Sequence, residues 1–225
     1  MPVCFFSFCR SSYRTQLVLN LMKIVNKVSR KKKVERLKFF KKIREMASTP
    51  SPGGCETLPS SPSSTGAQNA KSRRYDRQLR LWGDHGQVAL EKSRVCVVGA
   101  TATATEVLKS LVLPGVGHFT ILDGKKVTGE DIGNNFFLDK ESLGKVRGSV
   151  ATRLLLELNP EVRGDYVDES LEQVLSERKD FFLNFDLVIL TDIVNEKPLS
   201  NLSTFLWEHN VPLMVVRTYG LLGYV

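Results

Sequence analysis

The sequence is poor in the residues that build metal sites and disulfide frameworks. Its 225 residues include four cysteines and three histidines. No two cysteines form a CxxC pair, and no cysteine is accompanied by histidines at metal-ligand spacing. The histidines stand far apart, with no serine or cysteine nucleophile motif beside them. We therefore expect no metal site in this chain, and the cysteine usage favours a reduced compartment, the cytoplasm or the nucleus.

Long apolar runs are also missing. The apolar stretch at residues 17–25 is interrupted by Asn20 and Lys23. It is therefore much shorter than the roughly 18 apolar residues of a membrane-span candidate. No small-residue cleavage pattern follows a charged start, which argues against a secretory signal. The sequence predicts neither a membrane span nor secretion.

Acidic residues are scarce only in the first part of the chain. Residues 1–70 carry 13 lysines and arginines against three acidic residues, a net charge of +10. Residues 71–225 carry 19 against 21, a net charge of −2. An excess of positive charge on the folded part would be the electrostatic sign of a nucleic-acid partner. Since that excess is missing, we expect no nucleic acid as a partner.

The first 72 residues are expected to lie outside the folded domain. Within residues 1–45, apolar positions fall about one helical turn apart between lysines and arginines, which is typical of a basic amphipathic helix. Three interpretations of this extension are open: a membrane-surface helix, an organellar transit segment, or upstream sequence outside the working protein. Residues 46–72, which begin at Met46, are rich in serine, proline and glycine and predict a disordered linker. The domain itself is expected over residues 73–225.

Strands and helices alternate throughout that domain. The segments expected as strands are short apolar runs: 94–98, 118–123, 164–169, 185–190 and 211–217. Helical patterns separate them. This order predicts an α/β fold, a Rossmann-like and mostly parallel sheet with helices on both faces. Because a further strand is just beginning at 220–225, we expect the domain to be truncated at its C-terminus.

Glycine is missing where a nucleotide fold needs it most. In VCVVGATATATE (95–106), a strand runs through a turn into a helix, and Gly99 is the only glycine. Thr101, Thr103 and Thr105 put β-branched side chains where a phosphate would approach the N–H groups of the helix. Their hydroxyls can still cap the helix. The sequence predicts the start of a nucleotide-binding unit with a damaged phosphate loop.

Asp123 ends the second expected strand, and two interpretations of it are open. In dinucleotide folds, an acidic residue about 20 positions after the glycine turn binds a ribose hydroxyl. The alternative is a structural role in which the carboxylate caps the turn at Gly124. The same pattern leaves an NAD-dependent oxidoreductase as a rival function, although the missing G-x-G-x-x-G argues against it.

A series of motifs occurs in one order along residues 73–225. They are YDRQLRLWG (75–83), the strand–turn–helix at 95–106, LPGVGHFTILD (113–123), VTGEDIGNNFFL (127–138), LGK (143–145) and RTYGLLGY (217–224). Together they resemble the adenylation domain of the ubiquitin-like-protein activating enzymes. Within this family, the chain is most similar to the regulatory, non-thioester subunits of the neddylation branch, which activates the modifier of cullins.

The resemblance implies a function through a partner. Enzymes of this kind pair two related halves, of which one binds ATP and Mg²⁺ and adenylates the modifier while the other keeps the fold without the site. It implies that this chain binds no cofactor itself and pairs with a catalytic subunit, and that the ubiquitin-like modifier joins the assembled complex. Cys96, inside the first strand, fits a small buried side chain better than the thioester cysteine, which belongs to the partner.

The resemblance also implies roles for single residues. Arg77 matches an arginine that reaches, in trans, the ATP bound by the other half, and a planar guanidinium suits phosphate oxygens. The alternative for Arg77 is a solvated surface charge. Lys145 matches the family's lysine in LGK. Asp192 lies one position out of register with the aspartate that holds Mg²⁺ in an active half, and Lys197 is the only base near it in the sequence.

Other expectations concern the N-terminal helix and the loop before LGK. Asn134 and Asn135 stand where an active loop would supply Asn and Arg to the phosphates. Tyr75, Leu79 and Trp82 are expected as core or subunit-interface anchors. A remaining alternative is that the chain is a partial or inactive form of such a subunit.

Overall fold

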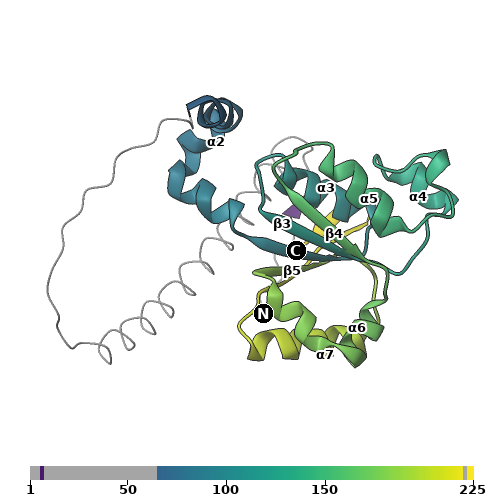
Figure 1. Ribbon diagram of the computed structural model, residues 1–225. Helices are drawn as coiled ribbons and strands as arrows, with labels where there is room; N and C mark the ends of the chain where they lie inside the picture. The colour runs from purple at the N-terminus through teal and green to yellow at the C-terminus, as the bar shows by residue number, and fades with distance from the viewer. Residues whose placement is uncertain (1–5, 8–64, 220–221) are drawn as a thin grey trace, which may run out of the picture.

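The computed structural model describes residues 6–7, 65–219 and 222–225 (Figure 1). Apart from Phe6–Ser7, the basic extension expected within residues 1–45 lies outside the described residues, as does the linker up to residue 64. Of the helices that the structure describes, none has both the length and the apolar character needed to cross a membrane.

A five-stranded sheet forms the centre of the domain. Its strands, in spatial order, are β4 (Arg163–Val167), β3 (His118–Leu122), β2 (Arg94–Val98), β5 (Leu187–Leu190) and β6 (Leu213–Val215). Every neighbouring pair is parallel, and Val95 of β2 lies opposite Phe119 of β3 and Leu187 of β5. From the central strand β2, the chain first adds β3 and β4 on one side and then β5 and β6 on the other. The predicted Rossmann-like parallel sheet is confirmed.

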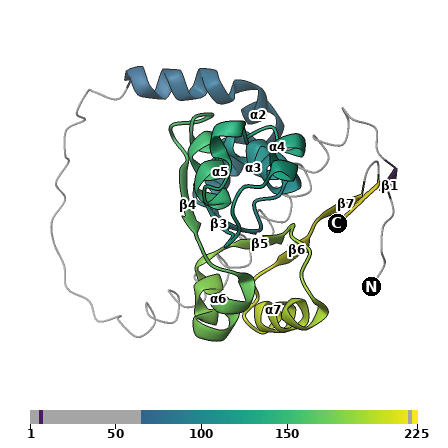
Figure 2. The same cartoon turned by 90° about the vertical axis from the view of Figure 1, so that its right-hand side faces the viewer.

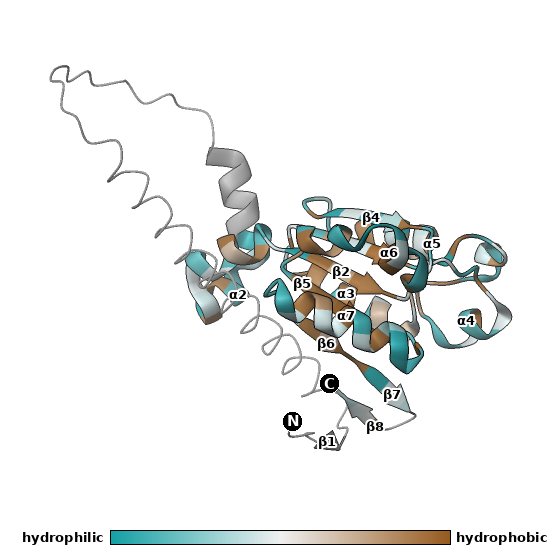
Figure 3. Cartoon of the chain, turned by 90° about the horizontal axis from the view of Figure 1, so that it is seen from below, coloured by the Kyte–Doolittle hydropathy of each residue, from teal (hydrophilic) through white to brown (hydrophobic). Residues whose placement is uncertain are grey.

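Helices cover both faces of this sheet (Figures 2 and 3). They are α3 (Ala102–Val112), α5 (Arg147–Leu156), α6 (Leu171–Glu177) and α7 (Glu196–Glu208). Since successive side chains of a strand point to opposite faces, β2 serves two separate cores. Val95 and Val97 join the core under α3 and α5, whereas Cys96 and Val98 join the core under α6 and α7.

The long helix α2 (Thr65–Glu91) packs along the edge at which the strands begin (Figure 1). It begins before Arg73 and so extends into the expected linker. Gly83, with φ of 68° and ψ of 175°, breaks the helical geometry and kinks α2. A left-handed φ of this kind is readily adopted only by glycine, so the glycine of the WG pair sets the bend.

Buried polar contacts anchor α2 to the domain. Tyr75 is 2% exposed, and its hydroxyl donates to Glu161 Oε2 and accepts from Asn159 Nδ2, both at 2.9 Å. Gln78 Nε2 donates to the carbonyl of Pro114 at 2.8 Å, just before β3. Trp82 is half-buried and packs against the same core. Of the two roles expected for Tyr75, Leu79 and Trp82, core or subunit-interface anchor, the structure shows the core role for Tyr75 and Trp82, and Leu79 is half-buried.

The remaining elements lie between and after these units. The expected loop at 124–144 contains two short helices, α4 (Gly129–Asn134) and η1 (Lys140–Ser142), and η2 (Lys179–Asn184) precedes β5. A second, antiparallel sheet consists of β1 (Phe6–Ser7), β8 (Leu222–Tyr224) and β7 (Arg217–Tyr219). The strand expected at 220–225 therefore pairs with β7 and β1, and it does not extend the parallel sheet.

Candidate functional site

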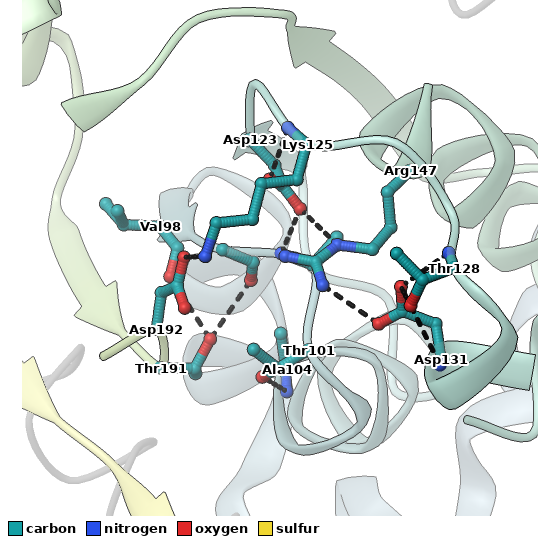
Figure 4. Close-up of polar contacts among 12 residues, drawn as sticks. Val98, Thr101, Ala104, Asp123, Lys125, Thr128, Asp131, Arg147, Thr191 and Asp192 are labelled. Carbon is teal, nitrogen blue, oxygen red and sulfur yellow. Dashed lines mark hydrogen bonds and ion pairs between the residues drawn. The ribbon is translucent and has the colours of Figure 1, made fainter. Parts of the chain in front are cut away.

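The candidate site lies at the edge where β2, β3 and β5 end (Figure 4). The residues that follow these strands are Gly99, Asp123 and Thr191. Because β2 is paired with β3 on one side and β5 on the other, its end is the point where the strand order reverses. Ligands of open parallel sheets bind at this point. The site is therefore where a nucleotide would be expected.

The turn after β2 is tied to the end of β5. Thr191 Oγ1 donates to the carbonyls of Val98 and Gly99 at 3.1 and 3.0 Å. Gly99 has φ of 86°, and a Cβ added to it would lie 2.6 Å from Cβ of Asp192. Glycine is thus required here for packing between two strand ends, independently of any phosphate.

The three threonines after Gly99 use their hydroxyls within the protein. Thr101 is the N-cap of α3, and its Oγ1 accepts from the N–H of Ala104 at 3.2 Å, which is the capping role expected for these threonines. Thr105 Oγ1 donates to Asn135 Oδ1 at 3.0 Å, and Thr103 Oγ1 lies 2.9 Å from Thr218 Oγ1. The three hydroxyls are therefore hydrogen-bonded within the chain, at the helix N-terminus where a phosphate loop would expose backbone N–H groups.

Asp123 is buried and already has three hydrogen-bond donors. Its Oδ2 accepts from the N–H of Ala100 at 2.8 Å and from Arg147 Nε at 2.7 Å. Its Oδ1 accepts from the N–H of Lys125 at 3.0 Å, across the turn at Gly124. These are the contacts expected of the turn-capping interpretation, and they leave little of the carboxylate for a ribose hydroxyl.

Arg147 is the central cation of the site, and sequence reasoning missed it. Its side chain is 8% exposed and also reaches Asp131, with Nη1 2.9 Å from Oδ1. Burial opposes the charge of Arg147, but the bonds to Asp123 and Asp131 outweigh it and raise its pKa. Burial likewise acts to raise the pKa of Asp131, but hydrogen bonds from Thr128 and Arg147 lower it overall. Both partners therefore stay charged at neutral pH.

Lys145, the residue that the LGK motif indicated, is exposed. The buried cation stands two residues later, at the first position of α5. The sequence offered one signal for it, a basic residue at the start of a helix whose other face is apolar. That signal gave no indication of the two aspartates that it joins, because they come from separate loops.

A second ion pair crosses the mouth of the site. Lys125 Nζ lies 2.7 Å from Asp192 Oδ2 and joins the loop after β3 to the loop after β5. The sequence had suggested Lys197 as the base near Asp192, and the structure instead places Lys125 against it. Asp192 Oδ1 also accepts from the N–H of Ile193 at 2.9 Å. Asp192 is therefore fully engaged by the chain itself.

The asparagines of the loop hold the loop in place. Asn135 is buried, and its Oδ1 accepts from Thr105 Oγ1 and from the N–H of Phe137. Asn134 is exposed at the end of α4.

The residues present do not fit ATP. The ion-paired cluster contains two cations and three carboxylates, so its formal charge is −1. A polyphosphate would meet this negative charge, the capped helix start and an aspartate that is already hydrogen-bonded. Among the described residues, no group of histidine, cysteine and acidic side chains is arranged to hold a metal ion.

Arg77 belongs to α2, the helix that packs at the opposite edge of the sheet, where the strands begin (Figure 1). It is exposed, and no hydrogen bond or ion pair joins it to another described residue. Its neighbours differ: Arg80 pairs with Asp76 at 2.9 Å, and Arg74 Nη2 donates to the carbonyl of Leu158 at 3.0 Å. Since α2 packs where the strands begin, Arg77 and the candidate site lie at opposite edges of the sheet.

Known proteins provide an independent comparison. A curated relative from Gallus gallus, named NEDD8-activating enzyme E1 regulatory subunit, is 55% identical over 160 residues, which cover 71% of this chain and 30% of that protein. A protein of the same name from Drosophila melanogaster is 54% identical over 153 residues, covering 68% of this chain and 29% of its own length. The chain therefore spans about 30% of the length of these relatives.

A solved structure and a family match give the wider relationship. The Escherichia coli tRNA N6-threonylcarbamoyladenosine dehydratase TcdA, solved in complex with AMP, has a TM-score of 0.56 at 21% identity and covers 65% of this chain and 59% of its own. At that identity the likeness establishes the fold alone. The ThiF family matches residues 75–225, which include all five parallel strands. With the match covering more than half of its length, this chain belongs to the ThiF family.

Proposed function

We propose that this chain provides the adenylation-fold portion of a regulatory subunit of a NEDD8-activating enzyme. It has no working nucleotide site and acts by pairing with a catalytic subunit, which binds ATP and Mg²⁺ and activates the ubiquitin-like modifier. One observation carries the proposal: the Asp123 carboxylate is already hydrogen-bonded within the chain. Its Oδ2 accepts from the N–H of Ala100 and from Arg147 Nε. The high identity to relatives of that name supports the pathway.

The chain alone is not expected to adenylate. Catalysis at a phosphate centre depends on positioning and on neutralising the charge of the phosphates. Here the side chains that would serve these purposes are bound to one another, and the cluster has a formal charge of −1. The pair needs one intact site, and the partner supplies it.

The thioester step also belongs to the partner. Cys96 is fully buried in β2, and burial raises the pKa of its thiol well above the ordinary value. The thiolate is the nucleophile of cysteine chemistry, so a buried and protonated thiol cannot attack an adenylate.

Arg77 is the residue through which this half can contribute to the chemistry. It is exposed, lies away from the chain's own strand ends and has no ion-pair partner among the described residues. A guanidinium offers a planar set of donors that stays charged and stabilises phosphate oxygens. In the assembled enzyme, we assign it to the phosphates of the ATP bound by the partner.

ATP–pyrophosphate exchange with NEDD8 tests the proposal. We expect background exchange with this chain alone, and co-purification of the chain with the catalytic subunit of a NEDD8-activating enzyme. Robust exchange by the chain alone would show that it has a working nucleotide site and would overturn this part of the proposal. A chain that folds and yet fails to bind the catalytic subunit would overturn the partnership.

A further inference from the structure

The strand β4 leaves one of its two edges open. It lies at the end of the parallel sheet and, of the described strands, is hydrogen-bonded to β3 alone. Figures 2 and 3 show it at the rim of the domain, with no described helix outside it. Its residues are exposed or half-buried along the whole strand. An open strand edge is a template on which another strand can pair.

The backbone groups of β4 face the two edges in turn. The N–H of Arg163 donates to the carbonyl of Gly117, just before β3, so the odd-numbered residues of β4 face β3. The N–H and carbonyl groups of Gly164 and Tyr166 therefore face outward. No hydrogen bond joins these groups to another residue that the structure describes. They are free to bond to a strand of a second molecule.

The two charged side chains of β4 have opposite signs and lie on one face. Arg163 and Asp165 are two positions apart, so both side chains point to the same side of the sheet. The side chain of Asp165 is 73% exposed, and its Oδ2 lies 2.9 Å from His118 Nε2. Arg163 is exposed and has no ion-pair partner among the described residues. The open edge therefore presents one cation and one anion side by side.

This pattern is self-complementary when the strand pairs antiparallel with itself about Gly164. The two Gly164 residues then exchange both N–H···O bonds, and Arg163 of each copy lies opposite Asp165 of the other. These are non-hydrogen-bonded positions, where side chains approach most closely, so two ion pairs form across the contact. In the neighbouring register Asp165 would lie opposite Asp165, and like charges would meet. The charges therefore favour the register centred on Gly164 and make a second β4 a complementary partner.

We propose that two copies of this chain associate through β4, which pairs antiparallel with itself about Gly164 and joins the two parallel sheets into one. The contact is isologous, because each copy supplies the same residues. The N–H of Tyr166 then lies opposite the carbonyl of Val162 in the other copy, which adds a second pair of backbone bonds. The contact uses neither the candidate site nor Arg77, so it does not depend on the partnership proposed above.

Sedimentation velocity of the full chain over a range of concentrations tests the contact. Arg163→Asp places like charges opposite each other, as does Asp165→Arg. The double variant, Arg163→Asp with Asp165→Arg, exchanges the two charges and recreates both ion pairs in the same register. Lys197→Asp is the matched control, because it reverses an exposed charge on α7, which packs against β6 at the other end of the sheet. Thermal unfolding followed by circular dichroism verifies that each variant is folded.

We expect the unmodified chain to dimerise with a Kd on the order of 10 to 100 μM, since the contact is one short strand pair. Each single reversal in β4 should weaken the dimer at least about fivefold, and the double variant should restore it to within about twofold. Lys197→Asp should match the unmodified chain. Exchange of the Gly164 and Tyr166 amide hydrogens should slow as the dimer forms.

Three results would each overturn the inference and leave the proposed function intact. The first is a chain that stays monomeric at concentrations about tenfold above that range. The second is a pair of single reversals in β4 that dimerise as well as Lys197→Asp. The third is a double variant that dimerises no better than the single ones, because charge would then not set the register.

Discussion

Replacing Arg147 should strongly destabilise the domain. Its side chain and that of Asp123 are 8% and 2% exposed, and Arg147 also joins Asp131. Removing one partner of a buried ion pair costs about 3 to 5 kcal/mol, because the other charge remains buried. In Arg147→Ala, Asp123 keeps the N–H groups of Ala100 and Lys125. We therefore expect the lower end of that range, about 3 kcal/mol.

Thermal unfolding followed by circular dichroism measures this loss. For a domain of this size, about 3 kcal/mol corresponds to a decrease in Tm of roughly 6 to 12 °C. Arg153→Ala is the matched control, since Arg153 lies on the same helix and faces Glu157 at 3.6 Å with both side chains 64% exposed. Such a surface pair is worth at most about 1 kcal/mol.

A double substitution isolates the ion pair from the loss of side-chain packing. Arg147→Met with Asp123→Asn removes both charges, and it should cost less than the sum of the two single changes. If Arg147→Ala lowers Tm no more than Arg153→Ala, the buried cluster does not hold this edge of the sheet. The ion pairs would then contribute no more to the stability of the domain than an exposed surface pair does.

Three further changes test neighbouring features. The pKa of Asp131 is lowered in the folded protein, so its contribution to stability is complete above about pH 4, the ordinary pKa of an unfolded aspartate. This contribution is lost as the pH falls through the folded pKa. Urea unfolding at pH 5 and pH 3 should show the loss, and Asp131→Asn should reduce it. Gly99→Ala should lower stability by about 1 to 3 kcal/mol in the same assay, because φ is positive and the new Cβ meets Asp192; an unchanged Tm would contradict the close packing. In the assembled enzyme, Arg77→Ala should slow single-turnover adenylate formation by roughly 10² with assembly intact, whereas Arg80→Ala should be nearly silent; equal effects at both positions would make Arg77 an ordinary surface charge.

The sequence predicted the sheet more completely than the site. Strand positions followed from short apolar runs, and parallel pairing followed from their alternation with helices. The damaged phosphate loop was also readable, because it depends on residues 99–105, which are adjacent in the chain. Periodicity did not indicate α4, since a six-residue helix with no buried residues has no apolar face.

The ionic contacts of the site could not be predicted from the sequence. Asp123 and Arg147 are 24 positions apart, and Lys125 and Asp192 are 67 apart. These contacts depend on which strand ends meet at the edge of the sheet and on how the loops after them turn. A motif records the residue types but not these distances, so Lys145 and Lys197 were as plausible as the lysine and arginine that the structure uses.

The same contacts join the loops at this edge of the sheet through side chains of the chain itself. In a nucleotide-binding domain, the ligand lies across several strand ends and holds their loops together. Here Arg147 joins the loop after β3 to α4 through Asp131, and Lys125 joins it to the loop after β5 through Asp192. The closed edge therefore does not depend on a ligand that binds and leaves. In the assembly that we propose, this edge holds α2 and Arg77 in one fixed position while the partner passes through the ATP-bound, adenylate and product states, as an arginine acting in trans requires.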